Sequence, residues 1–442
     1  MNDVVVIGGG AAGMLAASVA AERGLRVLLL EQGDRLGSKL RITGKGRCNL
    51  TNDCDVSEVL ANIPTGGRFL QSALNGFTPR DVMKLFESLG VPLKTERGGR
   101  VFPQSDKAAD IVDALRRYMD KSGVVQTRGR AVRIATEDGA VTGVVTADGD
   151  GIERAVSRAK PSLHNRFALG CAETAKHDII ACKSVILATG GMSYPATGST
   201  GDGYRMASEL GHTVTPIRGS LVPLEAEPDL CSRMQGLALK NVQLSIYDAA
   251  GKKPIFTDFG ELLFTHFGLS GPLVLSASAH MRDFDNNRTV RCRQYHTLID
   301  LKPALDEKKL DLRILRDFEK YSNRDFANAL GDLLSKLMIP VFVEQSGIPP
   351  DTKVHSISRE QRLGLVRLFK AFRIDIQRPR PVAEAIITSG GVDLREINPK
   401  TMESKLISGL HFAGEIIDAD AYTGGFNLQI AWSTAHAAGA HL

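Results

Sequence analysis

The amino-acid sequence predicts an α/β fold, in which a dinucleotide-binding domain is made from the two ends of the chain and a different segment is inserted between them. Residues 3–31 have the pattern strand, glycine turn, helix, strand. Residues 409–439 have the pattern strand, glycine turn, Ala-rich helix. Residues from about 213 to 372 instead show short alternating runs followed by long helical patterns. Because the ends share one pattern and the middle has another, the middle is an insertion.

Residues 3–31, DVVVIGGGAAGMLAASVAAERGLRVLLLE, form the first predicted βαβ unit. A short apolar run, typical of a strand buried on both faces, precedes a G-x-G-x-x-G pattern at Gly8, Gly10 and Gly13. The first glycine allows a tight turn, the second lets a pyrophosphate approach the backbone, and the third brings the helix close to the sheet. Glu31 ends the second strand, where its carboxylate can accept both hydroxyls of an adenosine ribose.

Two further segments indicate FAD rather than NAD as the dinucleotide. Residues 409–439 (GLHFAGEIIDADAYTGGFNLQIAWSTAHAAG) resemble the closing FAD segment of flavoproteins with two dinucleotide folds. In those proteins an acid after a strand binds the ribitol chain, and the next helix directs its positive N-terminus at the flavin pyrimidine. Glu415 stands where an Asp is more usual. Residues 184–191 (SVILATGG) resemble the strand and turn beside the adenosine of the same proteins.

Composition and charge favour an ordinary globular enzyme. The 442 residues suffice for two or three domains, and no apolar run is long enough to span a bilayer. The N-terminus enters the first strand at once, so we expect a cytoplasmic protein without a membrane segment. A net charge of +5, without basic stretches interleaved with aromatics, predicts no nucleic-acid partner. The sequence carries no signal for the oligomeric state.

Four segments are predicted from the pattern changes. They are an FAD-binding domain made of residues 1–197 and 382–442, an inserted β-rich subdomain at 198–304, and a helical segment at 305–381 that returns to the FAD-binding domain. The stretch 373–380 is expected to be a solvated edge strand because two prolines lie in and after it. The polar stretch 148–182 is expected to be a loop or a hairpin extension.

Two segments carry side chains suited to catalysis. In KLRITGKGRCNLTN (residues 39–52), Lys45 and Arg47 can supply positive charge to a reduced flavin or to an anionic substrate. The alternative is a solvated basic turn. In GELLFTHFGLSGP (residues 260–272), His266 is expected to transfer a proton, with an apolar environment that would lower its pKa. The alternative is a core histidine bonded to backbone.

Other chemistries lack their motifs. None of the six cysteines forms C-x-x-C, and neither H-x-x-x-H nor H-E-x-x-H occurs, so no metal site is expected. Cys48 and Cys54 have the spacing C-x5-C, whereas disulfide reductases carry C-x4-C, so we predict that they are not a redox couple. A serine hydrolase would need G-x-S-x-G, which is absent. Asp202 is expected to cap a helix. Its T-G-D-G step resembles that of flavoproteins related to fumarate reductase, which implies that this helix lies beside the flavin.

The combined motifs resemble one family over almost the whole chain. The segments IGGGAAG, TGKGRCNLTN, GRVFPQSDKA, ATGGMSYPATGSTGDG, GELLFTHFGLSGP, TSGGV and FAGEIIDADAYTGGFNLQ are similar to those of the BaiN/RdsA-like family of bacterial NAD(P)/FAD-dependent oxidoreductases. Its members include enzymes described as aminoacetone oxidases and as bile-acid Δ-reductases. The resemblance implies a glutathione-reductase-type FAD-binding Rossmann domain with an inserted β-barrel-like and helical segment.

The expected function is FAD-dependent hydride transfer between flavin N5 and a small organic substrate, such as an enone or a steroid-like double bond, with NAD(P)H as transient donor. The alternatives are an oxygen-dependent amine oxidase and, less favoured, a flavin-dependent RNA-modifying enzyme. The expected catalytic residues are His266, Arg47 and Lys45. The residues expected to contact FAD are Gly8, Gly10, Ala12, Gly13, Glu31, Lys39, Thr43, Gly44, Arg47, Asn49, Val132, Thr189, Gly190, Gly191, Asp202, Gly391, Gly414, Glu415, Gly425, Phe426, Asn427 and Leu428.

Overall fold

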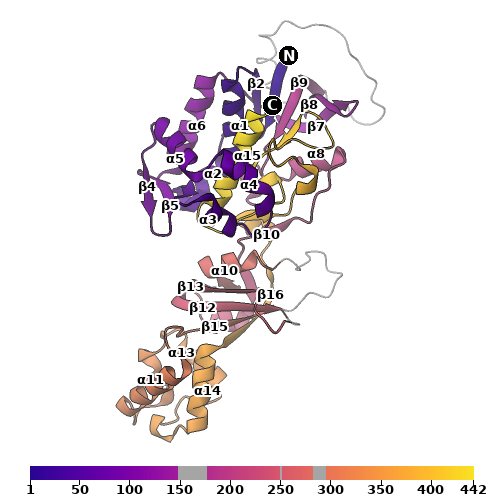
Figure 1. Cartoon of the computed structure of the whole chain (residues 1–442). Coiled ribbons are helices and arrows are strands. Elements are labelled where there is room, and N and C mark those ends of the chain that lie inside the picture. Colours follow the sequence, from indigo (N-terminus) through magenta and orange to yellow (C-terminus); the bar gives the residue numbers. More distant parts are fainter. Residues whose placement is uncertain (148–176, 249–250, 282–294) are drawn as a thin grey trace. The chain divides into compact units, whose positions relative to one another are not determined.

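The computed structural model describes residues 1–147, 177–248, 251–281 and 295–442, which form two compact units. The first unit comprises Met1–Arg218 and Ile386–Leu442, and the second comprises Gly219–Ala385 (Figure 1). The sequence placed the ends of the FAD-binding domain at residues 197 and 382. Helix α8 (Asp202–Glu209) belongs to the first unit, because its buried face joins the core of that unit.

The first unit is built on a mainly parallel sheet with the strand order β6-β2-β1-β9-β8-β7, to which β18 adds beside β9. Strands β6, β2, β1, β9 and β18 run parallel, whereas β8 is antiparallel to both of its neighbours. The apolar runs predicted as central strands are buried, as expected for strands covered on both faces. The bounds are β1 Asn2–Ile7, β2 Val27–Glu31, β6 Val125–Arg128, β7 Arg130–Glu137, β8 Ala140–Ala147, β9 His177–Leu187 and β18 Leu410–Phe412.

Helices α1 and α15 pack side by side, although they come from opposite ends of the chain (Figure 1). Both are rich in alanine and are buried on most sides, which permits close packing. A small antiparallel sheet, β3-β5-β4, lies in the same unit. Its bounds are β3 Thr51–Asn52, β4 Leu93–Glu96 and β5 Arg100–Pro103. The helices of the unit are α1 Ala11–Glu22, α2 Ser38–Ile42, α3 Val56–Ala61, α4 Gly67–Gly76, α5 Pro79–Ser88, α6 Ala108–Ser122, α8 and α15 Phe426–Ala440.

Of the stretch 148–182, the structure describes only the end. Residues 148–176 lie outside the described part of the chain. Residues 177–182 form the start of β9, where His177 pairs with Ala147 of the antiparallel strand β8. For these residues the expected hairpin extension is therefore what the structure shows, and the expected loop is not.

The second unit contains a closed antiparallel barrel with the order β11-β14-β13-β12-β15-β16. The expectation that residues 373–380 form an edge strand is wrong, because β16 pairs with β15 on one side and with β11 on the other. Alternate residues of β16 are buried, so one face points into the core. The strand bounds are β11 Leu224–Ala226, β12 Ala238–Asp248, β13 Phe256–Thr265, β14 Gly268–Ser270, β15 Tyr295–Asp300 and β16 Phe372–Pro379. The short strands β10 Arg218–Ser220 and β17 Ile387–Ser389 lie where the chain passes between the units.

The barrel and the helical segment of the second unit share one hydrophobic core. Phe342 of α13 and Phe369 of α14 pack with ring centroids 4.4 Å apart and ring planes tilted by 43°, in the same cluster as Phe264 of the barrel. The helices are α9 Pro228–Ser232, α10 Pro272–Ser278, α11 Glu307–Lys320, α12 Phe326–Ala329, α13 Ile339–Ser346 and α14 Arg359–Lys370. Among the described helices of both units, none combines the length and apolarity needed to cross a bilayer.

Candidate cofactor-binding site

A cavity in the first unit, called here the dinucleotide cavity, lies where the parallel strands end. Residues at or just after the carboxyl ends of β1, β2, β6, β9 and β18 line it, and it encloses about 1290 Å³, counting the part open to solvent. In open α/β sheets this edge is where ligands bind. The predicted contact residues that line it are Gly8, Gly10, Ala12, Glu31, Lys39, Thr43, Thr189, Gly190, Asp202, Gly414, Glu415, Asn427 and Leu428.

The turn between β1 and α1 has the geometry that its three glycines were expected to provide. Gly8 has φ +107°, and a Cβ there would lie 2.5 Å from the carbonyl oxygen of Ala188. A Cβ on Gly13 would lie 1.8 Å from the carbonyl oxygen of Gly8, so only glycine lets the helix come so close. A Cβ on Gly10 would meet no atom within 4 Å. Gly10 therefore faces open space, where a pyrophosphate could approach the first turn of α1.

Glu31 is fixed by backbone donors at the end of β2. Its carboxylate accepts N–H bonds from Gly9 and from Gly33, each at 2.6 Å. A carboxylate has about four lone-pair positions, so two remain for the hydroxyls of a ribose.

The N-terminus of α15 borders the same cavity through Asn427 and Leu428. The N-cap, Gly425, has φ +98°, and a Cβ there would lie 2.4 Å from the backbone of Thr51. The Asn427 amide holds the preceding loop by accepting from the Ala421 N–H at 2.9 Å and donating to the Ala421 carbonyl at 2.7 Å. The unpaired N–H groups of this first turn therefore present a fixed positive dipole end to the cavity.

Lys39 and Glu415 form an ion pair in the cavity wall. The Lys39 Nζ donates to Glu415 Oε2 and to Ser193 Oγ, each at 2.6 Å. The other carboxylate oxygen, Glu415 Oε1, accepts from Ser193 Oγ at 3.1 Å and from the Thr388 N–H at 2.8 Å. The side chains are 21% and 13% exposed, so the pair is only weakly screened by solvent. The acid that would bind a ribitol chain is thus held by three separate segments.

The residues present fit a bound FAD. The Thr189 hydroxyl is buried at the cavity wall without a hydrogen-bond partner among the described residues, and Gly10 leaves open space at a helix N-terminus. An orphaned polar group of this kind calls for a partner, which a ligand supplies. Glu31, the two helix N-termini and the Lys39–Glu415 pair would hold its ribose, phosphates and polyol.

The remaining predicted contact residues lie beside the cavity rather than in its lining, within the part of the chain that the structure describes. They are Gly13, Gly44, Arg47, Asn49, Val132, Gly191, Gly391, Gly425 and Phe426. Gly13 and Gly425 act on backbone packing instead. Asp202 does line the cavity, but it is not the N-cap of α8; Gly201 is, and the Asp202 carboxylate binds Arg130 at 2.9 Å.

Arg47 is engaged in a charged cluster with β4 and β5. Its Nε donates to Asp106 at 2.7 Å, its Nη2 donates to Glu96, and its guanidinium stacks 4.1 Å from the Phe102 ring centroid. Hydrogen bonds from Lys94 and Arg47 lower the pKa of Asp106. Lys45 is exposed in a left-handed turn, with φ +58°. In this structure the charge of Arg47 is therefore balanced by acids, and both residues remain predicted rather than demonstrated catalytic groups.

His266 lies in the second unit, in the two-residue turn between β13 and β14. It is exposed, and its ring meets Phe267 edge-on with centroids 5.0 Å apart. The guanidinium of Arg380 lies 4.8 Å from the centroid of the same Phe267. The expectation of an apolar environment around His266 is wrong, because the turn projects the imidazole away from the barrel core. Its predicted role in proton transfer stays a prediction.

The cysteines behave as ordinary thiols. Cys48 and Cys54 are both free, and burial raises the pKa of Cys48 to about 12 and that of Cys54 to about 11. Because the thiolate is the reactive form, these values support the prediction that the two are not a redox couple. Within the described residues, no group of three His, Cys, Asp or Glu side chains could hold a metal ion.

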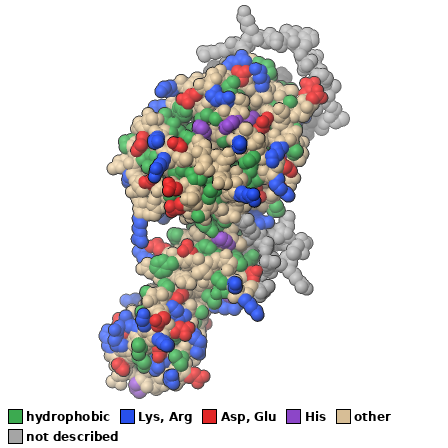
Figure 2. All heavy atoms as spheres, viewed as in Figure 1, with side chains coloured by type: hydrophobic (Ala, Val, Ile, Leu, Met, Phe, Trp, Pro, Cys, Tyr) green, Lys and Arg blue, Asp and Glu red, His purple; other side chains and the backbone are tan. Residues whose placement is uncertain are grey.

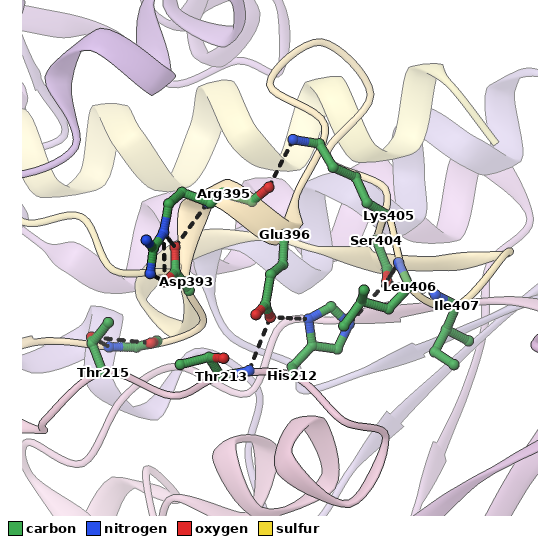
Figure 3. A network of polar contacts seen from close by, with 11 residues as sticks. His212, Thr213, Thr215, Asp393, Arg395, Glu396, Ser404, Lys405, Leu406 and Ile407 are labelled. Atoms are coloured by element: carbon green, nitrogen blue, oxygen red, sulfur yellow. Dashed lines mark hydrogen bonds and ion pairs between the residues drawn. The ribbon is translucent and has the colours of Figure 1, made fainter.

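A polar network elsewhere in the first unit resembles a hydrolytic triad but cannot act as one (Figure 3). His212 contacts Ser404 Oγ through Nε2 at 2.9 Å and Glu396 Oε2 through Nδ1 at 3.1 Å. The Ser404 oxygen, however, accepts backbone N–H bonds from Leu406 and Ile407, at 3.0 and 2.9 Å. With both lone pairs engaged, Ser404 is a poor nucleophile, and the network instead holds the 396–407 segment in place.

Sequence reasoning missed several residues of the site. Gln32 and Arg35 line the cavity, and Gln32 Nε2 donates to the Gly198 carbonyl at 2.8 Å. Their position directly after Glu31 could have indicated them. Ser193 and Thr388 lie in the motifs ATGGMSYPATGSTGDG and TSGGV, but their contacts with Glu415 could not be predicted because these segments meet only in the fold.

The fold and the cavity define a Rossmann-type dinucleotide-binding protein. A family model described as HI0933-like protein Rossmann domain matches residues 2–155 and 152–441, and the chain belongs to this family. The chain is 30% identical over 436 residues to the ribosomal RNA dihydrouridine synthase of Escherichia coli (strain K12), covering 98% of this chain and 96% of the relative. It is 29% identical over 443 residues to the 3-dehydro-bile acid delta(4,6)-reductase of Clostridium scindens, covering 99% and 98%.

Among solved structures, the 3-ketosteroid delta1-dehydrogenase of Sterolibacterium denitrificans matches with a TM-score of 0.50 and 14% identity, over 100% of this chain and 99% of that chain. At this identity the likeness shows the fold alone. The family match and the two relatives identify the chain as an FAD-dependent oxidoreductase of the BaiN/RdsA-like type. The predicted family and fold class are confirmed.

Proposed function

We propose that this enzyme reduces a carbon–carbon double bond that is conjugated to a carbonyl group in a small organic substrate, with NAD(P)H as the electron donor. Support comes from the names of the two relatives, since a bile-acid delta(4,6)-reductase and a dihydrouridine synthase both saturate such a bond. In a 3-oxo-Δ4 steroid and in uracil alike, a hydride adds to the carbon β to the carbonyl and a proton adds to the α carbon.

The observation that carries the proposal is the dinucleotide cavity, where two helix N-termini and a carboxylate–lysine pair surround one space. Bound FAD supplies the hydride chemistry. The N-terminus of α15 favours negative charge next to it, which is the charge that a reduced flavin carries. The Lys39–Glu415 pair would hold the polyol chain of the FAD. It adds no net charge to the cavity, because the two side chains have opposite charges.

We assign the proton to His266, whose imidazole is exposed and carries two nitrogens that can donate or accept a hydrogen bond. His266→Asn should retain FAD and slow reoxidation of the reduced flavin by the substrate by roughly 10²–10⁴-fold, with loss of one limb of the pH profile. His355→Asn, at another exposed position of the second unit, is the matched control. Wild-type rates in His266→Asn across the pH range would remove His266 from the reaction.

The reaction itself is tested by anaerobic stopped-flow absorbance. The flavin is first reduced with NADH or NADPH, and the reduced protein is then mixed with a 3-oxo-Δ4 steroid, with a uridine-containing RNA, or with air. The proposal predicts bleaching by a nicotinamide donor and faster reoxidation by the enone than by air. Bleaching by aminoacetone, with air as the effective oxidant, would favour the amine oxidase instead.

A uridine in RNA is the second candidate substrate, favoured by the 30% identity to a ribosomal RNA dihydrouridine synthase over nearly the whole chain. The face of the molecule that Figure 2 shows gives this candidate little electrostatic support. Figure 2 shows basic and acidic side chains intermingled on the visible face, without a single broad basic field. Reoxidation by the RNA but not by the steroid would establish this candidate in place of the first.

A further inference from the structure

A second hollow in the first unit, called here the arginine hollow, adjoins the dinucleotide cavity and shares Glu31 and Arg35 with it. It encloses about 1100 Å³, counting the part open to solvent. Four arginines from four different segments line it: Arg35 from the loop after β2, Arg41 from α2, Arg116 from α6 and Arg128 from the end of β6. Convergence of four guanidinium groups from separate elements is a costly arrangement unless negative charge compensates it.

The acids of the hollow compensate only part of this charge. Asp34 pairs with Arg128 at 2.8 Å, and Asp113 pairs with Arg41 at 3.3 Å. The remaining acid, Glu31, already accepts from two backbone N–H groups. The guanidinium groups of Arg35 and Arg116 make no hydrogen bond or ion pair with any residue that the structure describes. Two guanidinium groups are thus free to bind an anion.

A third arginine adds charge to the wall of the hollow. The Arg41 side chain is 32% exposed and pairs with Asp113, and its Nε is buried and has no hydrogen-bond partner among the described residues. Arg41 therefore contributes positive potential to the hollow without offering a free donor there.

We propose that the arginine hollow binds a phosphate group. The planar guanidinium fork matches phosphate oxygens in pairs, and arginine is preferred where such an anion is recognised. Arg116 and Arg35 supply guanidinium groups without partners among the described residues, Arg41 adds positive charge to the wall, and Arg128 can exchange Asp34 for the ligand. The phosphate can come from a free phosphate ester or from a nucleic-acid backbone, and the two sources share this chemistry.

The test is isothermal titration of the FAD-loaded full chain with inorganic phosphate, at an ionic strength held constant with chloride. Wild type should bind with a dissociation constant of about 1 mM or lower. Arg116→Ala should weaken binding at least about tenfold, because it removes a fork of charged hydrogen bonds. Arg116→Lys should recover only part of the affinity, since a point charge replaces the fork.

Lys121→Ala, which removes one positive charge from the same helix α6 outside the hollow, is the matched control and should bind like wild type. The flavin absorbance of all variants should be equal, since Arg116 does not line the dinucleotide cavity. Equal affinity in Arg116→Ala and wild type, or heat no larger than that of chloride, would overturn the proposal.

Two further titrations distinguish the sources. Glycerol 3-phosphate stands for a free ester, and a uridine-containing RNA hairpin stands for a backbone. Binding of the RNA that is competed by phosphate and lost in Arg116→Ala would assign a backbone phosphate. Binding of the ester alone would assign a free metabolite, and binding of neither, with no response to inorganic phosphate, would refute the site.

Discussion

The dinucleotide cavity of the first unit and the barrel of the second unit are lined in opposite ways, although both units contain glycines that leave no room for a Cβ. In the first unit, turns at Gly8 and Gly10 bring backbone to the edge of a cavity and leave it open. In the second, side chains such as Leu244 and Phe264 fill the barrel and are almost completely buried. The cavity of the first unit therefore leaves room to hold a ligand, whereas the interior of the barrel is filled by packed side chains that stabilise it.

The largest effect that separates the units is expected from a single methyl group on glycine. Gly13→Ala would place its Cβ 1.8 Å from the Gly8 carbonyl oxygen, so it should lower the free energy of unfolding by about 1–3 kcal/mol and abolish FAD retention. Gly331→Ala, in the second unit, meets no atom within 4 Å and should change stability by no more than about 1 kcal/mol. Urea unfolding measures the free energy of unfolding of both variants. Equal values for Gly13→Ala and Gly331→Ala would contradict the expected difference.

A smaller effect concerns the ribose end of the dinucleotide cavity. Glu31→Ala should weaken FAD binding by roughly 1.5–3 kcal/mol while slowing turnover of the FAD-loaded protein little, because Glu31 is expected to hold the ribose and not the reacting ring. Glu31→Gln keeps the length of the side chain but removes its negative charge, so it shows how much of the lost FAD affinity depends on that charge. FAD titration followed by single-turnover kinetics measures both. Full FAD retention with lost turnover would show that Glu31 has been assigned to the wrong part of the cofactor.

The parts of the site that the sequence predicts are those encoded within one short segment. The glycines after β1, the acid at the end of β2 and the N-terminus of α15 each follow from local pattern and backbone need. Arg47 shows the limit, since its partners Glu96 and Asp106 are about 50–60 residues away and reach it only through the β3-β5-β4 sheet. Likewise, the prolines in and just after β16 suggested an edge strand. The strand instead pairs on both sides, because the barrel closes between segments that are far apart in the sequence.

The smallest effect is a pH dependence of stability in the first unit. Burial lowers the pKa of His212, although Glu396 opposes the shift, so the folded state favours the neutral imidazole. Below about pH 6.5 the unfolded chain binds a proton that the folded chain resists, and stability should fall by up to about 1.4 kcal/mol per pH unit from this group.

His212→Asn should therefore show a shallower loss of unfolding free energy between pH 6.5 and 5.5 than wild type. Some slope should remain, because burial also lowers the pKa of His411 in the same unit. Urea unfolding at several pH values measures both slopes. Identical slopes would mean that His212 is protonated in the folded state as easily as in the unfolded chain.

The central claim, that the open backbone of the first unit exists to hold FAD, is tested most directly at Gly10. A Cβ there meets no atom within 4 Å of the protein, so Gly10→Val should leave the apoprotein fold unharmed and obstruct only a ligand. We predict that wild type binds one non-covalent, acid-releasable FAD per chain, and that Gly10→Val binds FAD at least about tenfold more weakly at unchanged apoprotein stability. Colourless wild-type protein that takes up no FAD, or equal affinity in Gly10→Val, would contradict the account.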